Sequence, residues 1–198
     1  MKKLCFLAML FMLAPFLFAQ SDAPEPQAQI PVKPALLVID IQNEYLKYMS
    51  EEDKESALRL INGAIWLFRQ HGHPIIRVYH SDPTYGPDPG DENFEFPSSV
   101  IIKEDDPMVV KNYPSAFKNT ELEELLRKKE CNTLFLCGLS AVGCVLATYY
   151  GAMERDFDVF MIKNALMSHK AQYTDFVEDV FDTVNWKTLQ FMLEHMQK

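Results

Sequence analysis

The sequence predicts an α/β fold of three layers (α/β/α), in which helices cover both faces of a doubly wound, mostly parallel sheet of about six strands. Short continuous apolar runs, such as residues 35–39 and 133–137, are typical of strands buried on both faces. Segments with apolar residues at helical spacing separate these runs, and strands that alternate with helices form parallel sheets. A chain of 198 residues suffices for one sizeable core, so we expect one folded domain.

The amino-terminal segment differs in composition from the rest of the chain. Two lysines open residues 1–19 and an apolar run follows them, a pattern typical of a secretory signal peptide that is cleaved after Ala19. A retained membrane anchor is the alternative, although the run is short for a span. Residues 20–34 are rich in Pro, Gln and Ala and are expected to form a disordered tether before a domain at residues 35–198. We therefore expect an exported protein, periplasmic or secreted. An intact-mass measurement that matches a chain starting after Ala19 would show it.

The net charge of the chain restricts its partners. Acidic residues outnumber basic ones by 28 to 19, and the net charge of -9 becomes -11 once the two leader lysines are removed. This balance argues against nucleic acid and, after leader cleavage, against an anionic membrane as a partner.

Cys131, Cys137 and Cys144 remain in the mature chain. Cys131 and Cys137 lie at opposite ends of one predicted strand, roughly 20 Å apart, which is too far for a disulfide.

The elements after the first strand alternate between helix and strand. Leu58, Ile61, Ile65 and Phe68 mark the apolar face of a helix over residues 51–71. Further elements are predicted as strands at residues 74–79, 108–111, 133–137, 158–163 and 183–185, and as helices at 120–129, from about 146, at 174–179 and after 185. Thr120 and Glu123 have the spacing of a capping box at the start of the helix over 120–129.

Three side chains that can take part in catalysis lie where predicted strands end. Asp40 follows the first strand, Lys111 ends the third, and Cys144 lies in the turn between the fourth strand and the next helix. Ligand sites in open parallel sheets form at the carboxyl ends of the strands. The unpaired amides at a helix start favour the thiolate form of a cysteine, which is the nucleophilic form. Although a lone cysteine is more often a small buried residue, the three together indicate a reactive site.

Three separated blocks carry a resemblance to a known family. They are residues 37–45 (LVIDIQNEY), residues 110–117 (VKNYPSAF) with Thr120 and Leu122, and residues 138–148 (GLSAVGCVLAT). With these blocks in this order, the chain resembles the isochorismatase-like cysteine hydrolase superfamily, which includes nicotinamidases, carbamoylsarcosine amidohydrolase and ureidoacrylate amidohydrolases. The resemblance covers most of the chain from about residue 35 and implies an isochorismatase-like fold.

The resemblance implies a mechanism and a set of roles. Cys144 would attack the carbonyl carbon of a small amide or ureido substrate to form a thioester, Asp40 would carry the proton, and Lys111 would orient both. A cis peptide bond between Leu139 and Ser140 is also implied. The backbone amides of Ser140 and Cys144 would form the oxyanion hole.

The resemblance also bears on substrate and metal binding. Tyr45, His80 and Phe117 are the residues expected to contact the small-molecule substrate. Nicotinamidases add a metal site of one Asp and two His after the second strand, where this chain offers His80 and Asp82 alone. We therefore expect no metal and no cofactor.

The segment over residues 83–106 is crowded with Pro, Gly and acidic residues and is long for a simple connection. In the family, this region helps to cover the pocket. Phe94 and Phe96 either line that pocket or anchor the loop to the core.

The sequence leaves two other functions open. One is a metal-independent isochorismatase acting on a vinyl ether, a reaction that does not need Cys144. The other is a non-enzymatic small-molecule-binding or scaffold protein. The substrate stays open because pocket loops vary within a fold. A homo-oligomer is possible because members of the family commonly form dimers or tetramers.

Overall fold

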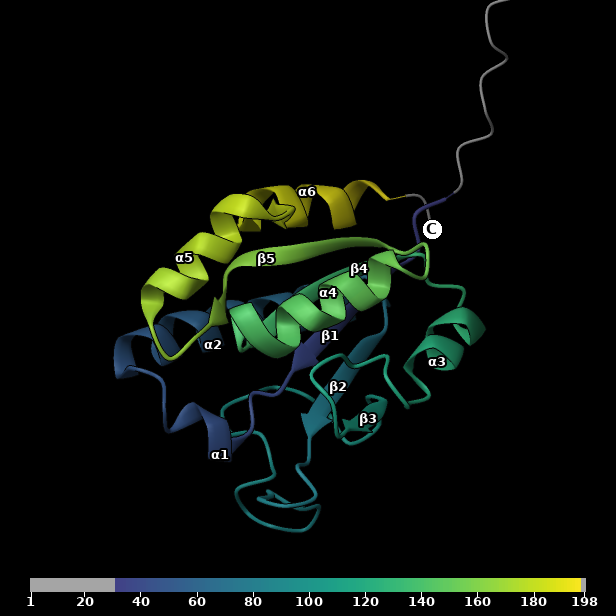
Figure 1. Ribbon diagram of the computed structural model, residues 1–198. Coiled ribbons are helices and arrows are strands. Elements are labelled where there is room, and N and C mark those ends of the chain that lie inside the picture. Colours follow the sequence, from purple (N-terminus) through teal and green to yellow (C-terminus); the bar gives the residue numbers. More distant parts are fainter. Residues whose placement is uncertain (1–30, 197–198) are drawn as a thin grey trace, which may run out of the picture. The chain divides into compact units, whose positions relative to one another are not determined.

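The computed structural model describes residues 31–196, and its centre is a sheet of six parallel strands (Figure 1). The strands are β1 (Pro34–Ile39), β2 (Ile75–His80), β3 (Met108–Lys111), β4 (Thr133–Leu139), β5 (Asp158–Met167) and β6 (Thr183–Val184). Their order across the sheet is β3-β2-β1-β4-β5-β6, and every neighbouring pair is parallel. The predicted doubly wound α/β fold is confirmed.

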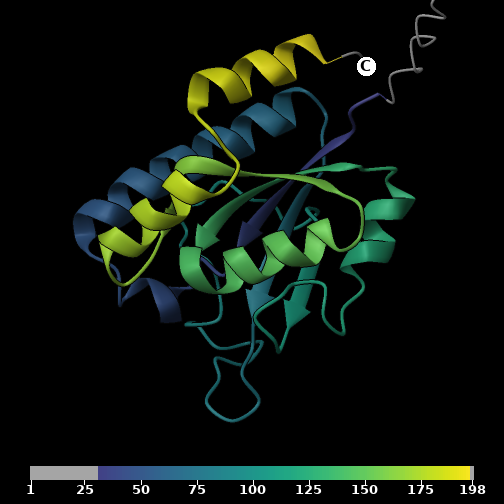
Figure 2. The ribbon, with the colours of Figure 1, turned by 45° about the horizontal axis from the view of Figure 1, so that its top comes forward.

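Helices cover both faces of this sheet. They are α1 (Asn43–Leu46), α2 (Glu51–Gln70), α3 (Leu122–Lys128), α4 (Leu146–Met153), α5 (Ala171–Val180) and α6 (Trp186–His195), and a π-helical segment η1 (Ala141–Val145) leads into α4. Residues of α2 and α6 pack with Leu36 and Val38 of β1, whereas α3, α4 and α5 pack with Leu37 and Ile39. Because successive strand residues point to opposite faces, these two clusters are the two sides of the sheet. Figure 2 shows α2 and α6 together on one side.

The strand order reverses between β1 and β4. From β1 the chain adds β2 and β3 on one side, and it then returns to place β4, β5 and β6 on the other side. Ligands of doubly wound sheets bind outside the carboxyl ends of the strands at such a reversal. Asp40 directly follows β1, and η1 with Cys144 follows β4. Two of the three predicted catalytic residues therefore lie at the reversal point.

Gly138 allows β4 to pass β1 at very short range. It pairs with Ile39 and has a φ of +116°, a conformation that favours glycine. A Cβ atom at this position would lie 2.0 Å from the carbonyl oxygen of Ile39. The turn that carries Cys144 therefore depends on a residue without a side chain.

Substitution Gly138→Ala is expected to lower the free energy of unfolding by about 3 kcal/mol or more, because it adds both a clash with backbone and a strained φ. Urea denaturation would measure the loss. The matched control is Gly90→Ala, since Gly90 has a φ of +103° but open space around it. A smaller loss of about 1 kcal/mol is expected for the control. Equal losses in the two variants would show that the contact with β1 is unimportant.

The fold begins slightly earlier than the predicted domain boundary. β1 starts at Pro34, and the backbone N–H of Lys33 donates to Oδ1 of Asn132 at 2.8 Å. This bond ties the residue before β1 to the residue before β4, and the tether over residues 20–34 stays a prediction. The predicted signal peptide at residues 1–19 and tether residues 20–30 lie outside the described part of the chain.

The predicted capping box of α3 is wrong. The Thr120 hydroxyl donates to the carbonyl oxygen of Ala116 and accepts from the Leu122 N–H at 3.3 Å, so it closes the preceding turn. The Glu123 carboxylate accepts from Nε of Arg155 at 2.9 Å. Tertiary partners have replaced the local pair that the spacing predicted.

Two strands run beyond their predicted ends. β4 reaches Leu139 and β5 reaches Met167, with a shift in register between them. Asn164, with a φ of +61°, interrupts the regular geometry of β5, and pairing resumes where Leu166 meets Gly138. Gly138 and Asn164, at which the sequence predicts strand ends, are therefore irregularities inside a longer ladder.

Phe94 and Phe96 anchor their loop to the core. Both are buried, and their rings stack on Tyr79 of β2 with centroid distances of 4.9 and 4.2 Å. The second of the two roles left open for these aromatics is the one that the structure shows. The long loop is thereby tied to the strand that ends in His80.

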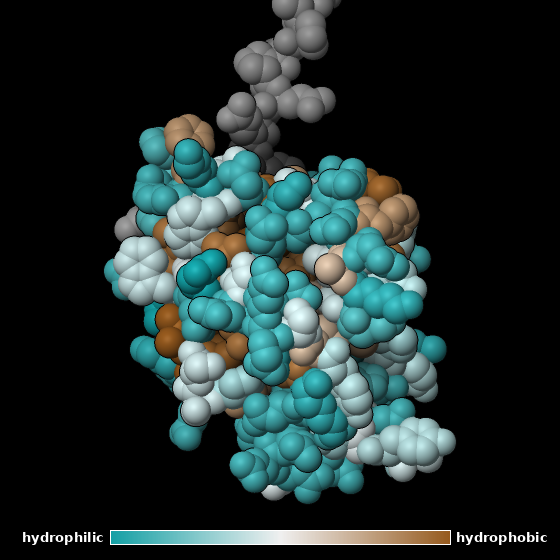
Figure 3. All heavy atoms as spheres, turned by 90° about the vertical axis from the view of Figure 1, so that its left-hand side faces the viewer, coloured by the Kyte–Doolittle hydropathy of each residue, from teal (hydrophilic) through white to brown (hydrophobic). Residues whose placement is uncertain are grey.

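The face in Figure 3 is covered mainly by hydrophilic side chains, and its apolar residues form small separate patches. Across residues 31–196, no helix has both the length and the apolar composition that crossing a membrane requires.

Candidate active site

Asp40 and Lys111 form a buried ion pair at the carboxyl edge of the sheet. Nζ of Lys111 lies 2.7 Å from Oδ2 of Asp40, and the two side chains are 0% and 3% exposed. A buried charge is tolerated only when an opposite charge or hydrogen bonds compensate it. Asp40 adopts a φ of +52°, which aspartate tolerates better than most residues. This pair joins two strand ends 71 positions apart in the sequence.

His80 lies in the path of the lysine side chain. β2 separates β3 from β1, so Lys111 must pass the end of β2 to reach Asp40. His80 ends β2, and its Nδ1 is 3.0 Å from Nζ of Lys111. Burial lowers the pKa of His80 most, and the positive charge of Lys111 lowers it further. The ring is therefore neutral at neutral pH, and its Nδ1 accepts a hydrogen bond from the ammonium group.

Tyr45 adjoins the same group. Its ring centroid lies 6.0 Å from that of His80, and its side chain projects from α1. Burial and the nearby Asp40 carboxylate raise the pKa of Tyr45. The phenol is therefore uncharged and can donate a hydrogen bond. The structure thus brings Tyr45 and His80, both expected to contact substrate, beside the ion pair.

Gln42 is a positioning residue that sequence reasoning missed. Its Nε2 donates to the carbonyl oxygen of His80 at 3.0 Å, and its Oε1 accepts from the His80 N–H at 2.7 Å. The side chain is fully buried. Both amide ends thus hold the end of β2 against the loop after Asp40. The block at residues 37–45 contains Gln42, but nothing in its spacing indicates this bond pair.

Cys144 completes the group. Its Sγ, a carboxylate oxygen of Asp40 and a ring nitrogen of His80 all lie within 4.8 Å of one another. Cys144 is partly exposed, whereas Cys131 and Cys137 are buried free thiols. The carbonyl oxygen of Ser140 accepts from the N–H of Gly143 at 2.9 Å and from that of Val145 at 3.2 Å, which closes the turn around the cysteine. Asp40, Lys111 and Cys144 thus meet at one place.

The Cys144 thiol is protonated at rest. Burial, as the larger cause, and the negative charge of Asp40 together raise the pKa of Cys144 to about 12. Desolvation and the neighbouring carboxylate thus outweigh the preference of the helix-start amides for the thiolate. Burial also raises the pKa of Asp40, against the opposing effect of Lys111. The nucleophile must therefore be generated by transfer of its proton.

The second carboxylate oxygen of Asp40 can accept that proton. Oδ2 is bound to Lys111, whereas Oδ1 is buried and has no hydrogen-bond partner among the described residues. Buried polar atoms in folded proteins nearly always have a partner, so an exception calls for an explanation. The Asp40 carboxylate lies beside the protonated Cys144 thiol, which is the composition of a general base next to its nucleophile.

The backbone before Cys144 has the predicted special feature. The peptide bond between Leu139 and Ser140 is cis, at the position that the resemblance indicates. Ser140 also places its Oγ 3.3 Å from Oγ of Ser168, the residue that directly follows β5. The assignment of the Ser140 and Cys144 amides to an oxyanion hole stays a prediction.

Phe117 lies in a different environment from Tyr45 and His80. Its side chain is buried, with its ring 5.9 Å from that of Phe157 and 5.1 Å from the Arg155 guanidinium. Packing in the core accounts for this aromatic residue. Its predicted contact with substrate stays a prediction that these neighbours do not support.

The second-strand residues do not fit the metal site of nicotinamidases. Oδ1 of Asp82 accepts from the N–H groups of Thr84 and Tyr85 at 2.7 and 3.0 Å, so its carboxylate closes a turn. His80 instead contacts Lys111. Asp82 is therefore not part of the group of possible ligand atoms around His80, which contains Asp40 and Cys144 instead.

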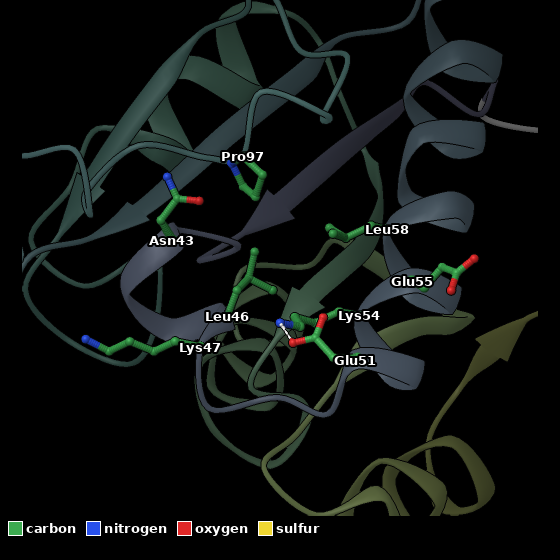
Figure 4. Close-up of a pocket in the computed structure, with 8 residues that line it drawn as sticks. All are labelled: Asn43, Leu46, Lys47, Glu51, Lys54, Glu55, Leu58 and Pro97. Carbon is green, nitrogen blue, oxygen red and sulfur yellow. Dashed lines mark hydrogen bonds and ion pairs between the residues drawn. The ribbon is translucent and has the colours of Figure 1, made fainter.

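A separate hollow of about 460 Å³ lies beside α1 (Figure 4). It is lined by Asn43, Leu46, Lys47, Glu51, Lys54, Glu55, Leu58 and Pro97. An ion pair of 2.6 Å between Lys54 and Glu51 lies in its wall. None of the three predicted catalytic residues lines this hollow, so it is distinct from the group around Asp40.

Comparison with known proteins identifies the family. The model of the isochorismatase domain matches residues 34–185. The chain belongs to the isochorismatase family. This isochorismatase-family chain is 30% identical over 146 residues to YddQ, an uncharacterized isochorismatase family protein of Bacillus subtilis, with 71% of this chain and 81% of YddQ covered. It is 28% identical over 134 residues to the secreted isochorismatase effector Isc1 of Verticillium dahliae, with 66% and 70% covered.

Solved structures agree with this assignment. The N-carbamoylsarcosine amidase of Thermoplasma acidophilum has a TM-score of 0.67 at 25% identity, with 78% of this chain and 95% of that one covered. An isochorismatase-like hydrolase from Alkaliphilus metalliredigens has a TM-score of 0.72 at 18% identity, with 84% and 100% covered, and shares the fold. The isochorismatase-family chain is accordingly a hydrolase.

Proposed function

We propose that this hydrolase cleaves the carbon–nitrogen bond of a small amide or ureido substrate through Asp40, Lys111 and Cys144. The observation that carries the proposal is the Cys144 thiol beside the buried Asp40 carboxylate, whose Oδ2 is bound to Lys111. The similarity to an N-carbamoylsarcosine amidase supports the substrate class.

The first half-reaction forms a thioester. Asp40 takes the proton from Sγ of Cys144 as the sulfur attacks the carbonyl carbon, and the carbonyl oxygen becomes an oxyanion. Backbone amides of Ser140 and Cys144 are the proposed donors to that oxyanion. When the tetrahedral intermediate collapses, the carbon–nitrogen bond breaks and Asp40 gives its proton to the leaving nitrogen. Ammonia or an amine departs, and the acyl group stays on the sulfur.

The second half-reaction returns the enzyme to its starting state. Asp40, again a carboxylate, takes a proton from water as the water oxygen attacks the thioester carbon. The carbon–sulfur bond then breaks, and the Cys144 sulfur recovers a proton from Asp40. The acid product leaves, and every proton taken by Asp40 has been returned.

The electrostatic environment suits this proton relay. Because burial raises the pKa of Asp40, its proton affinity is closer to that of the thiol, whose pKa is about 12, and the transfer is less uphill. Lys111 holds the carboxylate in place through Oδ2. The neutral His80 ring holds Lys111 in turn. His80 is therefore a positioning residue in this proposal, and Tyr45 is left free to contact the substrate.

Release of ammonia or amine from a panel of small amides, ureas and nicotinamide tests the proposal. At least one class is expected to be hydrolysed by the wild type and by Cys131→Ser, because Cys131 is buried at the opposite end of β4. Consumption of a vinyl ether with no carbon–nitrogen cleavage would contradict the proposal in favour of an isochorismatase. Failure of a thiol-directed electrophile to label Cys144 selectively, together with no turnover, would indicate a binding protein.

A further inference from the structure

The group around Asp40 also has the composition of a zinc site. Asp40, His80 and Cys144 each offer one ligand atom, and the three atoms lie within 4.8 Å of one another. A carboxylate oxygen, an imidazole nitrogen and a cysteine sulfur are the ligands that Zn²⁺ takes in proteins, and three protein ligands leave a fourth position open. This set differs from the site of nicotinamidases, since it includes both the proposed nucleophile and the proposed base.

The distances fit a zinc ion after a small adjustment. Zinc–ligand bonds of about 2.0 to 2.3 Å in tetrahedral geometry place the ligand atoms roughly 3.3 to 3.8 Å apart. No pair of the three atoms is more than 4.8 Å apart, so the pair that is farthest apart needs to approach by at most about 1 to 1.5 Å. All three side chains start from ends of neighbouring strands or from the turn that follows them, so the backbone already holds them on one edge.

A second observation concerns the same carboxylate group. Oδ1 of Asp40 is buried without a hydrogen-bond partner among the described residues, and Asp40 is 2% exposed. A carboxylate oxygen in this state gains more from a cation than one that is already hydrogen-bonded. It is the oxygen that Lys111 leaves unused.

Lys111 is the competitor of such an ion. Its ammonium group contacts Asp40 Oδ2 and His80 Nδ1. A neutral imidazole has one nitrogen lone pair, so a metal on His80 requires the contact with Lys111 to break. The Lys111 ammonium group thus lies where a divalent ion would otherwise bind.

We propose that Asp40, His80 and Cys144 form a zinc-binding site in which the ion displaces the Lys111–His80 contact and reversibly blocks the nucleophile and the base. Formation of the zinc–sulfur bond releases the thiol proton to solvent, so binding strengthens as pH rises. The inference rests on ligand geometry and does not depend on the identity of the substrate.

Binding of Co²⁺ and Zn²⁺ to the reduced protein tests the site without any activity measurement. The wild type is expected to bind one Co²⁺ with thiolate-to-cobalt absorption, and calorimetry should give at least a tenfold weaker Zn²⁺ affinity for Cys144→Ser. Cys131→Ser is the matched control, with wild-type affinity expected. Wild-type zinc affinity in Cys144→Ser, or no thiolate absorption in wild type at saturating Co²⁺, would overturn the proposal.

A second variant tests the competition with lysine. In Lys111→Met the rival cation is gone, so Zn²⁺ is expected to bind at least tenfold more tightly and to raise the unfolding midpoint more than it does in wild type. An equal or smaller shift in the variant would contradict the competition. If hydrolysis of amides is not found, these binding results still stand, which separates the two proposals.

Discussion

Replacement of Cys144 by alanine is expected to lower kcat/KM for carbon–nitrogen hydrolysis by at least about a thousandfold, because no thioester can form without the sulfur. Serine at this position should cost a similar factor, since its hydroxyl holds its proton more tightly than a thiol does. The fold should survive both changes, because the side chain is small and partly exposed. Steady-state release of ammonia or amine would measure the loss, with circular dichroism as the check of folding.

The control for this result is Cys131→Ser, which alters a buried thiol far from Asp40 and should leave kcat/KM unchanged. Mass spectrometry of wild type mixed rapidly with substrate should show the acyl adduct on Cys144 alone. Retention of most activity in Cys144→Ala would rule out the thioester route. It would favour chemistry that does not use the cysteine, such as cleavage of a vinyl ether.

Few assumptions are needed to predict from the sequence that the three catalytic candidates lie close together. All strands of a parallel sheet end on the same edge, so residues that terminate buried apolar runs lie near one another in any strand order. In the structure, Asp40 and Cys144 follow β1 and β4, the two adjacent strands at which the strand order reverses. Apolar runs and helical spacing were therefore enough for the fold and for the approximate location of the site.

The contacts of His80 could not be predicted in the same way. Its bond with Lys111 exists because β2 lies between β1 and β3, and strand order is a property of the whole sheet. Its backbone contacts with Gln42 are likewise tertiary. A residue with no motif of its own therefore acquires its place from the topology.

Two local arguments failed for a common physical reason. The amides near Cys144 favour a thiolate, yet burial and the Asp40 carboxylate raise the pKa of the thiol to about 12. Thr120 and Glu123 have capping-box spacing, yet Ala116 and Arg155 bind their side chains. In both cases a tertiary neighbour outweighs a short-range preference, and the sequence pattern contains only the latter.

Replacement of Lys111 by methionine is expected to lower the free energy of unfolding by about 3 to 5 kcal/mol at neutral pH, because it leaves the buried Asp40 carboxylate without its counter-charge. Hydrolysis should be lost as well, since the base is no longer held in its ionised form. Urea denaturation would measure the first effect. Lys128→Met, which removes an exposed lysine of α3, should change stability by less than about 0.5 kcal/mol.

The pH dependence distinguishes a lost counter-charge from lost packing. Without Lys111, burial raises the pKa of Asp40 further above its unfolded value, so the native variant binds more protons than the unfolded chain. Its stability should therefore fall as pH rises through the ordinary aspartate range and beyond, and the deficit relative to wild type should shrink in acid. The double variant Asp40→Asn/Lys111→Met should recover part of the loss, because no buried charge remains unpaired. A deficit that is the same at acid and neutral pH, with no recovery in the double variant, would show that the lysine contributes mainly through its packing.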